Sequence, residues 1–86
     1  MPIISSFFGI IVRMYYGDHS PPHFHAEYQG QRATFDFDGD LILGQIRSKN
    51  ARKLIQEWAV QHKTELMLNW ESIEQGLPIE RIEPLD

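Results

Sequence analysis

The first half of the chain alternates between apolar and polar side chains, and this period of two is typical of half-buried β-strands. Strands are predicted over residues 8–15, 23–29, 32–38 and 41–46. Gly30 and the Gly39-Asp40 pair are turn signals, and the short connections that they imply favour antiparallel neighbours. The first half therefore predicts a four-stranded antiparallel β-meander.

The second half changes to the period of a helix. Apolar side chains recur at spacings of three and four from Ala51 to Ile73 and form one stripe. Ser48 has the side chain of an N-cap, and Gly76 is typical of the position just past a helix end. The stretch predicts either one long helix or two short helices with a break near residues 61–64.

These elements predict an α+β fold in which the helical segment packs on one face of the sheet. We expect one domain, residues 1–86, made of a β-sheet half (1–46), a helical half (47–76) and a C-terminal tail (77–86) that packs back on it. The helices are expected to cover the face that carries Phe24, Phe35 and Phe37. The opposite face then presents polar side chains, which are Arg13, Tyr15, His23, His25, Glu27, Arg32, Thr34 and Asp36.

Composition narrows the classes of function. The chain has no cysteine, which excludes a disulfide framework, a cysteine-based zinc site and a thiol nucleophile. The net charge of −4 argues against bulk electrostatic binding to nucleic acid and leaves a nucleic-acid partner uncertain. No apolar run approaches the about 20 residues of a membrane span, and the first residues lack the basic region of a secretory signal. We therefore expect a cytoplasmic protein with no membrane association and no cofactor.

The densest chemical feature is the run DHSPPHFH at residues 18–25, which holds three of the four histidines. His23 and His25 share one strand face, so their rings are expected to lie close together, with His19 folding over them from the loop. Three interpretations stay open: a metal site formed by these histidines with Glu27, acid–base chemistry, and simple contact with a partner.

The acid–base interpretation assigns a role to each of six residues. Beside two histidines, an anion clamp supplies most of what metal-independent RNA cleavage requires. The assignments are His23 and His25 as the acid–base or ligand pair, His19 as a mobile third group, Arg13 as the anion clamp, and Tyr16 and Asp18 as orienting groups.

A second candidate lies at the start of the helical half, where cations gather and acids are absent. Helix starts with added cations bind anions, so this cluster predicts a phosphate-bearing ligand or an acidic partner, with a solvated basic turn as the alternative. The residues assigned to anion or partner binding are Arg47, Lys49, Arg52 and Lys53 in this cluster, and Tyr15, Glu27 and Arg32 on the sheet face.

Segments from both halves carry a resemblance to a known family. They are MPIIS, FGI and IVRMYY at the start, DH, PPHFH and EY around the loop, and Trp58, His62, Glu65-Leu66, Asn69-Trp70 and IEPL (82–85) later in the chain. Together they resemble the bacterial domain-of-unknown-function family 4160 over nearly the whole chain.

The resemblance implies a place in a two-gene module. Members of this family are similar to small operon-encoded products found beside domain-of-unknown-function family 2442, an arrangement that looks like a toxin and its antitoxin. It implies a toxin-like component with a small cognate protein as partner, and it implies no mechanism. The alternatives are a non-catalytic protein–protein interaction module and a histidine-based metal-binding domain. The polar face also suits a homodimer surface, and whether the protein is an enzyme stays open.

Overall fold

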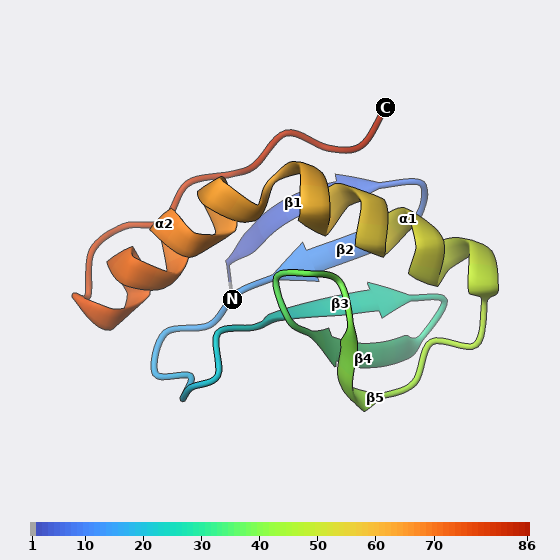
Figure 1. Cartoon of the computed structure of the whole chain (residues 1–86), viewed down its shortest axis with the longest axis horizontal. Helices are drawn as coiled ribbons and strands as arrows, with labels where there is room; N and C mark the ends of the chain where they lie inside the picture. Colours follow the sequence, from blue (N-terminus) through green and yellow to red (C-terminus); the bar gives the residue numbers. More distant parts are fainter. Residues whose placement is uncertain (1) are drawn as a thin grey trace.

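The computed structural model describes residues 2–86, and within this range the chain forms five strands followed by two helices (Figure 1). The strands are β1 (Ile3–Phe7), β2 (Ile10–Arg13), β3 (Phe24–Tyr28), β4 (Gln31–Phe35) and β5 (Leu41–Gly44). The helices are α1 (Lys49–Gln61) and α2 (Lys63–Glu74). The strands pair antiparallel in sequence order, so the α+β class and the antiparallel meander are confirmed, with five strands instead of four.

The additional strand, β1, was not predicted from the alternation of apolar and polar residues, and the reason is local. Its pairing with β2 shifts register between Ile3 and Ser5, and Ile4 and Ser5 are buried one after the other. Such an irregularity removes the alternation on which the prediction depends. Phe8 was placed in a strand, but with Gly9 it forms the turn between β1 and β2, where its φ is 49° and its side chain is 59% exposed.

The helical stripe is divided into two helices at His62, inside the interval where a break was expected. The His62 backbone has φ −115° and ψ 25°, outside the helical range, and its carbonyl oxygen accepts from the Leu66 N–H. The Ser48 side chain accepts a hydrogen bond of 3.0 Å from the Ala51 N–H, which confirms it as the N-cap of α1.

Aromatic side chains join the helices to one face of the sheet. The Phe24 ring stacks on Phe35 and Phe37, with ring centroids 5.7 and 6.5 Å apart. Trp58 of α1 meets Phe24 edge-on at 5.4 Å, and Trp70 of α2 meets Phe37 edge-on at 6.2 Å. Both helices therefore cover the Phe24 face, as predicted, and neither described helix lies on the opposite face of the sheet (Figure 1).

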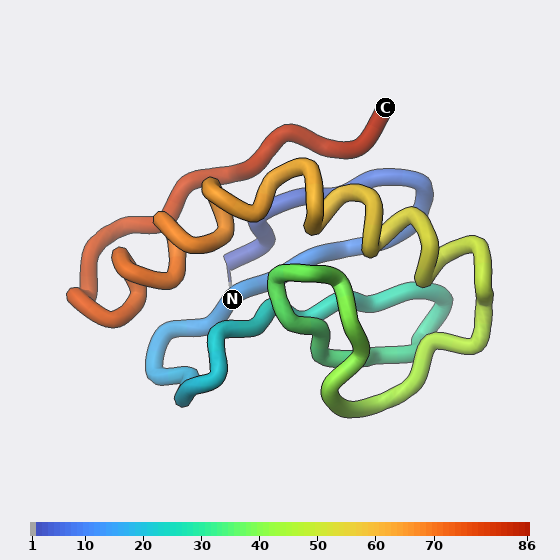
Figure 2. The backbone as a smooth tube through the Cα atoms, viewed as in Figure 1, coloured from blue at the N-terminus to red at the C-terminus, as the bar shows by residue number. Residues whose placement is uncertain are grey.

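The residues after α2 run back along the helices and past β1 as an extended segment (Figure 2). The Asn69 side chain forms two hydrogen bonds with the Glu80 backbone, of 2.8 and 3.1 Å. The Trp58 indole N–H donates to the Glu83 carbonyl oxygen at 2.9 Å, and the Ile82 N–H donates to the Ile4 carbonyl oxygen at 2.7 Å. The tail thus fixes the helices to the β1 edge. Neither helix of the described chain is long and apolar enough to cross a membrane.

Candidate functional site

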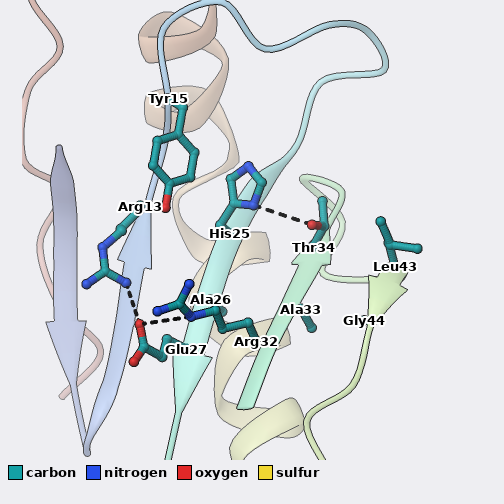
Figure 3. A pocket seen from close by; sticks show the side chains of 10 residues that line it. All are labelled: Arg13, Tyr15, His25, Ala26, Glu27, Arg32, Ala33, Thr34, Leu43 and Gly44. Carbon is teal, nitrogen blue, oxygen red and sulfur yellow. Dashed lines mark hydrogen bonds and ion pairs between the residues drawn. The ribbon is translucent and has the colours of Figure 1, made fainter. Parts of the chain in front are cut away.

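The face of the sheet opposite the helices carries a polar pocket (Figure 3). Cross-strand pairing places Arg13 opposite His25, His25 opposite Thr34, and Glu27 opposite Arg32. Because side chains on one strand alternate between faces, these residues emerge together on the side that the helices leave open. They border a pocket of about 370 Å³, which is large enough for a small ligand group.

The charges in this pocket are arranged around one carboxylate. The Arg13 guanidinium donates to Glu27 Oε1 at 2.7 Å, and the Arg32 Nε lies 3.7 Å from the same oxygen (Figure 3). Two guanidinium groups and one carboxylate leave a net positive charge. The pocket therefore suits an anionic group, although the protein as a whole is acidic.

A second cluster, made of Asp18, His23 and His25, adjoins the pocket. One oxygen of Asp18, Oδ2, lies 3.1 Å from Nε2 of His23 and 3.1 Å from Nε2 of His25. The centroids of the two imidazole rings are 5.1 Å apart. The structure thus brings together two histidines that are two residues apart with an aspartate from the preceding loop. We call this group the Asp–His cluster.

Hydrogen bonds and ring contacts fix the orientation of both imidazoles. His23 Nδ1 lies 2.7 Å from the Pro21 carbonyl oxygen, and a carbonyl only accepts, so this nitrogen carries a proton. His25 Nδ1 lies 3.4 Å from the Thr34 hydroxyl. The Tyr15 ring meets His25 edge-on at 4.6 Å. His25 Nε2 forms a hydrogen bond with the Asp18 carboxylate, and His23 Nε2 lies at the same distance from it.

His23 occupies a different place from the open sheet face on which it was expected. β3 begins one residue later, at Phe24, so His23 lies at the end of the sheet. Its ring packs 5.3 Å from the ring of Trp70 in α2. The Asp–His cluster therefore bridges the end of the polar face and the second helix.

Three of the proposed site residues lie apart from the Asp–His cluster. Glu27, a candidate metal ligand, forms an ion pair with Arg13. His19 is exposed, and it does not belong to the cluster of described residues whose possible ligand atoms lie within 4.8 Å of one another. The Tyr16 hydroxyl donates to the Leu77 carbonyl oxygen at 2.7 Å. Tyr16 therefore connects the loop to the tail instead of orienting the histidines.

The basic cluster at the start of α1 forms a separate surface. Lys49, Arg52 and Lys53 border a second pocket of about 380 Å³, which shares no residue with the pocket on the polar face. Arg52 donates to the carbonyl oxygens of Ile46 and Arg47, so its guanidinium stabilises the turn that leads into the helix. The cluster does not contribute to the histidine site.

Sequence reasoning missed the apolar edge of the sheet. Leu41, Ile42 and Leu43 of β5 are all exposed, and Leu43, the most exposed of them at 71%, also borders the polar pocket. Within residues 2–86, β5 pairs with β4 alone and is an edge strand of the sheet. The signal was available, because three consecutive apolar residues in the last strand of a meander cannot all point into a core.

Fold and site together define a small α+β protein with a five-stranded antiparallel meander and an Asp–His cluster beside a cationic pocket. A family model described as Domain of unknown function (DUF4160) matches residues 9–71. The chain belongs to this family, as the resemblance indicated, and the matched residues contain the whole Asp–His cluster. Comparisons with curated proteins and with solved structures find no match.

Proposed function

We propose that this protein is the toxin-like component of a bacterial two-gene module, active in the cytoplasm, and that its polar sheet face is the active site. The observation that carries the proposal is the Asp–His cluster, in which one carboxylate oxygen contacts two imidazoles beside a cationic pocket. Histidines with an adjacent carboxylate and an anion-binding group form a versatile catalytic arrangement.

The role proposed for each residue of the site follows from the position of its side chain. His23 and His25 serve as the acid–base or ligand pair, and Asp18 orients the His25 ring through its hydrogen bond and lies 3.1 Å from His23 Nε2. Arg13 and Arg32 attract an anionic group of the substrate into the pocket. Glu27 fixes the Arg13 guanidinium in place through the 2.7 Å contact, which reduces the entropy lost when the anion binds.

Growth after induced expression of the protein alone tests this proposal. The wild type is expected to arrest growth, and His23→Ala/His25→Ala at the same soluble level is expected to lose the effect. His62→Gln is the matched control, because His62 contacts Glu65 at the helix junction, outside the polar face. A folded double variant that still arrests growth contradicts the active site, and a harmless wild type contradicts the toxin-like function.

The edge strand β5 favours a second candidate, a non-catalytic interaction module. In the other edge strand, β1, the Ile4 carbonyl oxygen accepts from the tail, whereas the edge strand β5 presents exposed apolar side chains. Such an edge accepts a strand from another chain. We propose as partner the small cognate protein that resembles domain-of-unknown-function family 2442, with a second copy of this chain as the alternative.

Co-expression with such a partner distinguishes the two candidates. Leu43→Glu is expected to reduce recovery of the complex, whereas Met67→Glu, at a 52% exposed apolar position on α2, is expected to leave it unchanged. The His23→Ala/His25→Ala variant keeps the complex if the histidines are catalytic and weakens it if they contact the partner. A homodimer through β5 appears instead as a concentration-dependent increase in size of the protein alone.

A further inference from the structure

We infer that Asp18, His23 and His25 form a binding site for a divalent transition-metal ion of the zinc class. Zinc lies about 2.0–2.2 Å from histidine nitrogens and carboxylate oxygens, so two ligands at tetrahedral or octahedral angles are about 2.9–3.5 Å apart. The Asp18 Oδ2 atom is 3.1 Å from each Nε2, and all three ligand atoms lie within 4.8 Å of one another. Both distances from Asp18 to the imidazole nitrogens therefore fall in the range expected for two ligands of one ion.

The surroundings of the two imidazoles support a metal site. A histidine ligand usually donates its other ring N–H to an oxygen, which fixes the ring and directs the lone pair at the ion. His23 Nδ1 donates to the Pro21 carbonyl oxygen at 2.7 Å, and His25 Nδ1 has the Thr34 hydroxyl at 3.4 Å. Both rings therefore have an outer contact of the kind that is usual for metal-binding histidines.

The competing explanation is a carboxylate that accepts hydrogen bonds from two charged imidazoles with no ion present. Asp18 Oδ2 forms a hydrogen bond of 3.1 Å with His25 Nε2, whereas its contact with His23 Nε2, at the same distance, lacks hydrogen-bond geometry. Hydrogen bonding to Asp18 therefore accounts for the position of the His25 ring and not for the close approach of His23 Nε2. One metal ion satisfies both imidazoles and the carboxylate at once.

The donor set selects the kind of ion. Two imidazole nitrogens and one carboxylate oxygen suit zinc, iron, cobalt and nickel, whereas magnesium and calcium prefer oxygen ligands alone. Three protein ligands leave a position open, which is the pattern of catalytic zinc sites. His25 also borders the cationic pocket, so an anion bound in that pocket would lie beside the metal site.

Metal binding stands on this geometry alone, and only a role for the ion in growth arrest rests on the proposed function. The two ideas therefore fail separately. A protein that binds metal without arresting growth contradicts the proposed function, whereas one that arrests growth without binding metal contradicts the present inference.

Titration of the purified, untagged, metal-free protein with Co²⁺ and Zn²⁺ tests the inference. Co²⁺ binding is followed by its visible absorption, and Zn²⁺ binding by calorimetry. We expect one ion per chain for each metal and no binding of Mg²⁺. Loss of a buried outer contact of a ligand weakens metal binding by about 10- to 100-fold. We therefore expect a loss of at least about 100-fold for Asp18→Asn and His25→Ala, and of about 10-fold for Thr34→Val.

Two controls make the outcome decisive. His19→Ala and His62→Gln keep wild-type affinity, because neither side chain belongs to the site; His62 also tests whether its 2.8 Å contact with Glu65 captures an ion instead. Circular dichroism establishes that each variant is folded. A folded wild type that binds no ion overturns the inference, and so does an Asp18→Asn variant that binds as tightly as the wild type.

Discussion

Gly39 tests the contact between the sheet and the first helix. It lies in the turn between β4 and β5 at φ +83°, and a Cβ atom there would lie 2.6 Å from the Gln56 Cα in α1. Gly30 has almost the same φ, +80°, but its Cβ would meet nothing within 4 Å. Alanine at Gly30 therefore measures the backbone cost alone, and alanine at Gly39 adds the clash with the helix.

The magnitudes follow from these two positions. A left-handed conformation costs an L-residue about 1–2 kcal/mol, offset by about 0.4–1 kcal/mol because alanine restricts the unfolded chain. Gly30→Ala is thus expected to lower the free energy of unfolding by about 1 kcal/mol. Gly39→Ala adds about 1–3 kcal/mol for overpacking against backbone. A chain of 86 residues has about 4–13 kcal/mol of stability, compared with a total loss of about 2–4 kcal/mol for Gly39→Ala, so circular dichroism first establishes that each variant is folded.

Urea unfolding, followed by the fluorescence of the buried Trp58 and Trp70 side chains, measures both effects. We expect the urea concentration at the midpoint to fall from wild type to Gly30→Ala and further to Gly39→Ala. The m value, the dependence of the free energy of unfolding on urea concentration, is expected to stay unchanged. Equal midpoints for the two variants would refute the reasoning, because the turn at Gly39 would then not lie in close contact with α1. The placement of the helices, on which the open polar face depends, would be wrong with it.

Three further variants test other contacts. Asn69→Ala removes two hydrogen bonds to the Glu80 backbone and is expected to cost about 1–3 kcal/mol, with faster amide exchange in the tail. The hydrogen bond to Asp38 raises the pKa of Lys63 above its ordinary value of 10.5. The Lys63–Asp38 contact therefore stabilises the folded state at pH values below 10.5, and this stabilisation is lost as the pH rises through the raised pKa. An NMR titration in which Asp38→Asn leaves the Lys63 pKa raised contradicts this assignment. Tyr16→Phe is expected to keep growth arrest and to cost about 1 kcal/mol or less, because its hydroxyl contacts the tail and not the histidines.

Alternation along the strands predicted the fold where one face was buried and the other polar. In β3, Phe24 and Ala26 are buried while His25 and Glu27 are partly exposed, so the period of two was unmistakable. Within β1, a register shift places Ile4 and its polar neighbour in the interior together, and no pattern of single residues reveals such a shift.

The candidate site was predictable only as far as local geometry determines it. His23 and His25 are two residues apart on an extended chain, so the sequence alone predicts that their rings lie near each other. Glu27 was assigned to the histidines, yet it pairs with Arg13, its diagonal neighbour across β2 and β3. The approach of Asp18 to both rings depends on the path of a loop with consecutive prolines, which strand periodicity does not specify.

The unequal edges of the sheet limit how many chains can assemble through it. A fibre of added strands needs an acceptor at each end of every subunit. Here the Ile82 N–H of the tail donates to the Ile4 carbonyl oxygen of β1, whereas β5 pairs on one side only within the part of the chain that the structure describes. Strand addition therefore stops after one event, giving a one-to-one complex with a partner or a two-fold dimer. The apolar edge can serve recognition without the polymerisation that such an edge would otherwise invite.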